Sequence, residues 1–167
     1  MTGKTDVKFI RPPNLLRDRV RQNEGQEVDF SAAEAALEKL APAFVAGLPK
    51  ALSDIEKAYS ALKSDPGDAK LRTELFRLVH DLKGQAGTFN YMLITVIGND
   101  LCRFIERDIV LTPPCIKVIG FHIEAMKRVT KDKITGDGDG LGMQMVNLLQ
   151  QKTHDVLQDA SPQTTLD

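Results

Sequence analysis

Apolar residues recur at helical spacing along most of the chain, and no stretch alternates in the way that a β-strand does. The first periodic segment begins near Ser31, which forms a capping-box pattern with Glu34, and continues to Leu62. Pro42 and Pro49 fall inside it and are expected to kink or divide the helix. The apolar positions of this segment are Leu37, Leu40, Phe44, Leu48, Leu52, Ile55, Tyr59 and Leu62.

Four more helices are predicted, beginning near Asp68, Met92, Pro113 and Asp139. The first of these ends at about Phe89, where Asn90 suits the left-handed conformation that terminates helices. The next ends at about Asp108, and Pro113-Pro114 suits the first turn of the one that follows. Asp139 is expected to cap the last helix. Long helices with short connections predict an all-α fold, an antiparallel four-helix bundle with an additional N-terminal helical segment.

This pattern divides the chain into three parts. Residues 1–28 are charged and contain Pro12-Pro13, so we expect an N-terminal extension that is partly disordered or loosely docked. Residues 29–158 are expected to form the helical bundle, and residues 159–167 a disordered tail.

Composition narrows the class of protein. Of the 167 residues 42% are hydrophobic and 27% are charged, with a net charge of −1, which argues against a nucleic-acid or membrane-surface binder. Cys102 and Cys115 form neither a metal-type pair nor a disulfide framework. The N-terminus has no apolar signal-peptide region. We expect a cytoplasmic protein, a monomer, that binds neither nucleic acid nor membrane.

The segment HDLKGQAGTFN, residues 80–90, carries the candidate chemistry. If the apolar stripe of its helix faces the core, His80 lies roughly 140° away from that direction, facing solvent. Gly84 and Gly87 fall on the same exposed face, and Lys83 lies between His80 and the edge of the core. Glycine inside a helix costs about 0.5–1 kcal/mol relative to alanine, so two on one face need a reason. We interpret them as leaving space for a partner to approach the imidazole, although close helix packing is the alternative reading.

This segment resembles the signature of the histidine phosphotransfer domains of bacterial phosphorelays, His-x-x-Lys-Gly-x-x-Gly. The match covers His80, Lys83, Gly84, Ala86 and Gly87, and LCRFIE, residues 101–106, resembles the end of the next helix in that family. Asn90 stands where many members have glycine. The resemblance implies a four-helix bundle that accepts a phosphoryl group on an exposed histidine.

The resemblance also implies roles and partners. His80 is the expected phosphoacceptor, and Lys83 is expected to stabilise the phosphoryl charge. Gly84 and Gly87 would give the partner access. Phe76 and Arg77, one turn before His80, are expected to dock the partner, with core packing the alternative for Phe76.

The expected partners are response-regulator receiver domains and a sensor or hybrid histidine kinase. No intrinsic cofactor or metal site is expected, and Mg²⁺ would come from the receiver. The chain would be a phosphocarrier without kinase activity of its own. Kinase phosphoacceptor domains of chemotaxis typically orient the histidine with a glutamate, and the matching position here is about Cys102. That difference favours a free-standing carrier.

Two other functions fit parts of the sequence. A metal-dependent phosphohydrolase could use His80-Asp81 as a dyad, but such enzymes need a histidine upstream, and His80 is the first in the chain. A helical adaptor, or a degenerate phosphotransfer domain that binds receivers without transfer, remains the alternative function. His122 and His154 are isolated and are expected to be structural or surface residues.

Overall fold

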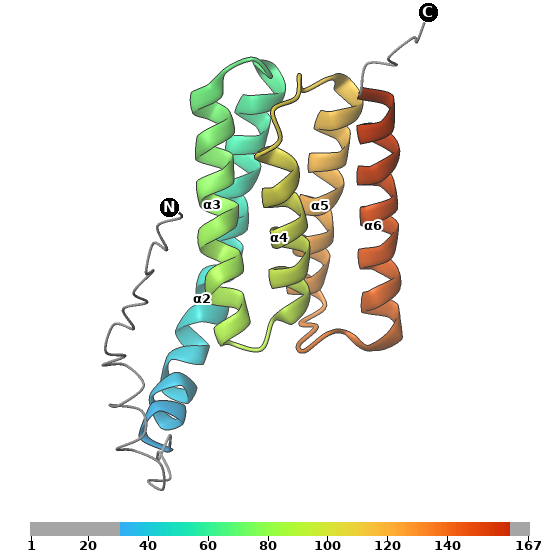
Figure 1. Cartoon of the computed structure of the whole chain (residues 1–167). Coiled ribbons are helices and arrows are strands. Elements are labelled where there is room, and N and C mark those ends of the chain that lie inside the picture. The colour runs from blue at the N-terminus through green and yellow to red at the C-terminus, as the bar shows by residue number, and fades with distance from the viewer. Residues whose placement is uncertain (1–30, 161–167) are drawn as a thin grey trace, which may run out of the picture. The chain divides into compact units, whose positions relative to one another are not determined.

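A computed structural model describes residues 31–160, and within them all regular secondary structure is helical (Figure 1). By its contacts the chain divides between Glu34 and Ala35, and the bundle described below begins at Ala35. The predicted all-α fold is confirmed. Residues 1–28 and the tail beyond residue 160 lie outside the described part. The five helices are α2 (Ser31–Ser64), α3 (Ala69–Thr88), α4 (Met92–Ile105), α5 (Pro113–Lys131) and α6 (Asp139–Ala160).

Helix α2 is continuous through both of its prolines, so, of the kink or division predicted for them, the division does not occur. Pro42 and Pro49 each remove one helical N–H, which leaves the carbonyls of Glu38 and Val45 without a helical partner. All four residues are exposed, so water can donate to the two carbonyls. The hydrogen bonds lost to proline can therefore be replaced by solvent.

The ends of α3 are defined as the sequence predicts. Asp68 is the N-cap, and its carboxylate Oδ1 accepts from the backbone N–H of Lys70 at 2.6 Å and of Leu71 at 3.3 Å. At the other end Asn90 has φ +62°, in the left-handed region. The Asn90 carbonyl accepts from the Gly136 N–H at 2.6 Å, which ties the α3–α4 turn to the α5–α6 turn.

Helix α4 ends three residues earlier than predicted, at Ile105 rather than about Asp108. Residues 106–108 are exposed, so no apolar contact extends the helix beyond Ile105. Arg72 on α3 crosses to the loop that follows and donates from Nη2 to the carbonyl of Ile109 at 2.7 Å. The prolines at 113 and 114 open α5, as predicted.

Helix α6 begins at Asp139, as predicted, and continues through Ala160, two residues beyond the expected end of the bundle. The side chain that accepts the Asp139 N–H is the carboxylate of Asp137, at 3.1 Å, in place of the expected cap by Asp139 itself. The turn before the helix closes on α4: a Cβ on Gly138 would lie 2.4 Å from the side chain of Leu93.

Apolar faces from all five helices form one core. Helix α3 packs along α4, and α6 packs against both α5 and α4 (Figure 1). Helix α2 joins the bundle through Tyr59, whose hydroxyl donates to the Ile116 carbonyl of α5 at 3.1 Å, and through Phe44, whose ring stacks on Phe89 with centroids 4.6 Å apart. His122 on α5 is fully buried, and its Nε2 lies 3.1 Å from the carboxylate of Asp100 on α4. His122 is therefore structural, as predicted.

Candidate functional site

His80 is exposed on α3, on the side of the helix away from the core. The apolar stripe that orients α3 is as predicted: Leu75, Val79, Leu82 and Ala86 are buried. Because the stripe fixes the rotation of α3, the imidazole of His80 is held in solvent.

Phe76 and Arg77, the two residues expected to dock a partner, are both engaged within the protein. Phe76 is half-buried against the core, and its ring centroid lies 5.6 Å from that of His80. Arg77 is exposed and donates to two carboxylates, those of Glu74 at 2.7 and 3.0 Å and of Asp81 at 3.2 Å. The Arg77 guanidinium holds the pKa of the Glu74 carboxyl below its usual value through that hydrogen bond. The positive charge of Arg77 is thus balanced by its own helix.

Lys83 differs from Arg77 in its partner. It is half-buried and extends toward α4, where its Nζ donates to the side-chain Oδ1 of Asn99 at 3.1 Å. Within residues 31–160 Lys83 makes no ion pair. An amide oxygen accepts a hydrogen bond but carries no net charge. Lys83 is therefore a fixed cation one turn from His80 whose charge is not neutralised within the described part of the chain.

The two glycines lie in different surroundings. Gly84 is exposed, and a Cβ built on it would meet nothing within 4 Å. Gly87 is half-buried, and its Cβ would lie 3.2 Å from Oγ1 of Thr95 on α4. The expectation of an open face thus fits Gly84, whereas the geometry at Gly87 fits the alternative of close helix packing. The reason is that Gly87 lies on the side of α3 that turns toward α4.

Cys102 lies on α4 at the position matched to the chemotaxis-kinase glutamate. Its side chain is buried, and burial raises the pKa of the thiol to about 11 from an ordinary value of 9.0. The thiol is therefore neutral at pH 7. It places no negative charge near Lys83, in contrast to a glutamate.

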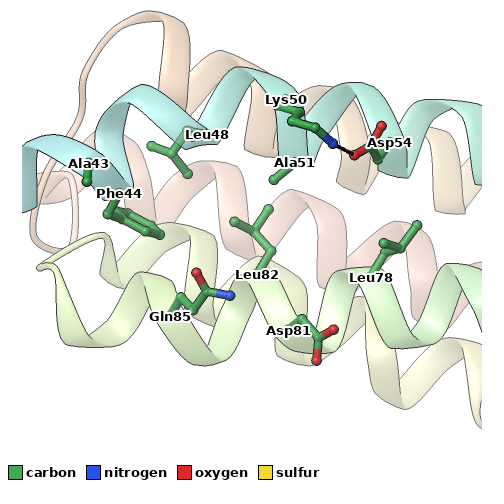
Figure 2. A pocket seen from close by; sticks show the side chains of 11 residues that line it. Ala43, Phe44, Leu48, Lys50, Ala51, Asp54, Leu78, Asp81, Leu82 and Gln85 are labelled. Atoms are coloured by element: carbon green, nitrogen blue, oxygen red, sulfur yellow. Dashed lines mark hydrogen bonds and ion pairs between the residues drawn. The ribbon is translucent and has the colours of Figure 1, made fainter. Parts of the chain in front are cut away.

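A groove beside α3 lies between that helix and α2 (Figure 2). It has a volume of about 300 Å³ and an apolar floor that includes Phe44, Leu78 and Leu82. An ion pair of Lys50 with Asp54, 2.6 Å apart, borders it on the α2 side (Figure 2). Asp81, the residue after His80, borders it on the α3 side.

The metal-dyad reading finds no support in this geometry. Asp81 is paired with Arg77, and residues 31–160 hold no group of three or more histidine, cysteine, aspartate or glutamate side chains arranged to bind a metal ion.

None of the helices in residues 31–160 combines the length and apolar character needed to cross a bilayer.

The sequence reasoning missed Asn99 and Thr95. Both are polar residues on α4, the most apolar of the five described helices, and both contact Lys83 in the segment around His80. Their polarity was the available signal, but the sequence does not show which face of α4 meets α3.

Comparison with known proteins identifies the family. No curated protein and no solved structure matches the chain. The model of one family, described as the Hpt domain, matches residues 39–128, which is more than half of the chain and includes all of α3, α4 and the histidine segment. The chain belongs to the Hpt domain family, the histidine phosphotransfer domains of two-component phosphorelays.

Proposed function

We propose that His80 accepts a phosphoryl group from a phospho-aspartate of a receiver domain, or from a histidine kinase, and passes it to a response-regulator receiver. The observation that carries this proposal is an exposed imidazole one turn from a cation that has no counter-ion in the described range. Family membership supports phosphotransfer in general. The choice of His80, Lys83 and receiver partners is our inference.

The chemistry needs little from this chain. A nitrogen lone pair of the neutral imidazole attacks phosphorus, an N–P bond forms as the O–P bond of the acyl phosphate breaks, and the aspartate leaves as a carboxylate. The ring keeps its other N–H and becomes a phosphorylated imidazolium, so total charge is conserved at −2. The reverse sequence delivers the group.

Phosphoryl transfer depends on positioning and on neutralising the equatorial oxygens. Lys83 supplies one positive charge from this chain, and we expect the receiver to bring Mg²⁺ and the acidic residues. No intrinsic cofactor is part of the proposal.

We place the contact with the receiver on the exposed arc of α3 that contains Arg77, His80, Asp81 and Gly84. Gly84 leaves that arc open beside the imidazole. Arg77 and Asp81 present both signs of charge in a fixed pair. Phe76 is half-buried, so we assign it to supporting the His80 ring rather than to docking.

Labelling by a phosphorylated receiver domain tests the proposal. The wild-type chain should acquire an acid-labile, alkali-stable label, because an N–P bond is hydrolysed in acid. His80→Gln should abolish the label without changing the helical content or melting temperature, since the side chain is exposed. His154→Gln is the matched control, because His154 is also an exposed helical histidine but lies on α6.

The same assay decides between the carrier and the adaptor. Label that survives His80→Gln contradicts the site. Binding to receivers without any label, over a panel of receiver domains from the source organism, favours the adaptor that binds without transfer.

A further inference from the structure

Three residues of one turn of α4 contact a single residue of α3, Lys83. Thr95 donates from Oγ1 to the Lys83 carbonyl at 3.1 Å. Asn99 accepts from the Lys83 ammonium at 3.1 Å. Gly98 is buried between them, and a Cβ there would lie 2.8 Å from the Cβ of Lys83. The spacing of these residues, i, i+3 and i+4, puts them on one face of α4.

Each contact fixes a different part of Lys83. Thr95 holds its backbone, and Gly98 makes room for the base of its side chain to lie close against α4. Asn99 then receives the ammonium at the end of the side chain. A lysine on an exposed helix face ordinarily samples many rotamers, so a hold at three points is a specific restraint.

The chemistry of Asn99 distinguishes this hold from a salt bridge. The neighbouring cation Arg77 donates to two carboxylates, and their negative charges balance its positive charge. An asparagine amide orients an ammonium equally well but leaves its charge available to an incoming anion. Thr95 is likewise uncharged, and Cys102, the next residue of α4 along this face, is a neutral thiol.

We infer that Asn99 is a positioning residue for phosphoryl transfer, which with Thr95 and Gly98 aims the uncompensated charge of Lys83 toward a phosphoryl group on His80. This inference rests on the proposed function and deepens it. It assigns to α4 a part in transfer that the histidine motif on α3 does not contain. Lys83 is the group that touches the phosphoryl oxygens, and Asn99 acts through it.

The test measures the initial rate of His80 labelling by two donors. One is a phosphorylated receiver domain, and the other is phosphoramidate, a small molecule that needs no docking surface. Asn99→Leu removes the acceptor with little change of size and should slow labelling by both donors about tenfold or more, because misplacing a group by about 1 Å can cost 10²-fold. Asn147→Leu, an exposed asparagine on α6, is the matched control and should leave both rates unchanged.

The lysine background separates positioning from a structural role. In Lys83→Gln, which has no ammonium to aim, Asn99→Leu should cause no further slowing. Equal slowing in both backgrounds, or no slowing in the wild-type background, overturns the inference.

A second variant tests the charge directly. Asn99→Asp keeps an acceptor for Lys83, but its carboxylate balances the charge of the ammonium. Transfer should therefore slow, while the melting temperature is maintained or rises. Transfer as fast as wild type in this variant contradicts the argument. All of these comparisons require that the wild-type chain is labelled at His80, and failure of the wild type would instead refute the proposed function.

Discussion

Alanine at two glycines of the site should have different effects on stability. Gly84 and Gly98 both lie inside helices, so replacing either by alanine gains the same intrinsic preference, about 0.8–1.0 kcal/mol. The difference between the two variants is therefore set by what the new methyl group meets. At Gly84 it meets nothing within 4 Å.

At Gly98 the methyl group would lie 2.8 Å from the Cβ of Lys83 and 3.8 Å from its Cα. The base of a side chain cannot rotate away from this contact, so α3 and α4 must separate. Overpacking of this kind costs typically 1–3 kcal/mol. Gly98→Ala should then range from neutral to about 2 kcal/mol destabilising, and the two alanine variants should differ by about 1–3 kcal/mol.

Thermal melting measures this difference, because about 1 kcal/mol corresponds to a shift of roughly 3–5 °C for a domain of this size. Gly84→Ala should raise the melting temperature by about that amount. A clear fall for Gly84→Ala would mean that this position packs against another element, and it would refute the facing of α3 on which the site depends.

Transfer kinetics separate access from stability at the same position. In the series Gly84→Ala and Gly84→Gln, labelling by a phosphorylated receiver should slow as the side chain grows, while labelling by phosphoramidate should stay at the wild-type rate. Bulk at residue 84 keeps a protein surface from the imidazole but not a small molecule. Equal receiver rates in wild type and Gly84→Gln would show that the glycine does not serve access.

Two further predictions concern the supporting fold. Burial raises the pKa of the Cys102 thiol from an ordinary 9.0 to about 11, so its contribution to stability is complete below about pH 9. That contribution, at most about 2–3 kcal/mol, is lost as the pH rises toward 11. Chemical denaturation across this pH range should therefore show a steeper fall of the unfolding free energy for the wild type than for Cys102→Ala. Gly120→Ala should lower the melting temperature, because its Cβ would lie 2.6 Å from the Tyr59 hydroxyl that donates to Ile116, and the loss should shrink in a Tyr59→Phe background if this contact is its cause.

The periodicity of single helices was enough to predict much of this molecule. The buried stripe of α3 follows from the positions of its leucines and valine, and the exposure of His80 follows from the stripe. The start of α3 near Asp68 and its stop at Asn90 were predictable because the side chain of Asp68 and the backbone of Asn90 act within a few residues of their own position. The prolines of α2 misled because the cost of a missing hydrogen bond depends on solvent access to the freed carbonyl, which the local sequence does not contain.

Properties that depend on two helices were not accessible in the same way. Gly84 and Gly87 fall on the same exposed arc when α3 is considered alone. Only the position of α4 shows that one faces solvent and the other faces Thr95. For the same reason Lys83 and Arg77 look equivalent as cations near His80 in the sequence. The charge of Arg77 is balanced by carboxylates of its own helix, whereas Lys83 is held by Asn99 across the interface.

This contrast indicates how the two helices divide the work of the site. In the proposed site helix α3 presents the nucleophile, and a helix can do that alone because the exposure of one face needs only an apolar stripe on the other. A cation that must remain unpaired yet fixed cannot be held by carboxylates of its own helix, since those would cancel its charge, as they do for Arg77. It needs a neutral acceptor at the correct height on a neighbouring helix, and Asn99 on α4 meets that requirement. In the proposed mechanism the α3–α4 interface therefore does more than stabilise the bundle: its register determines where the Lys83 charge is held.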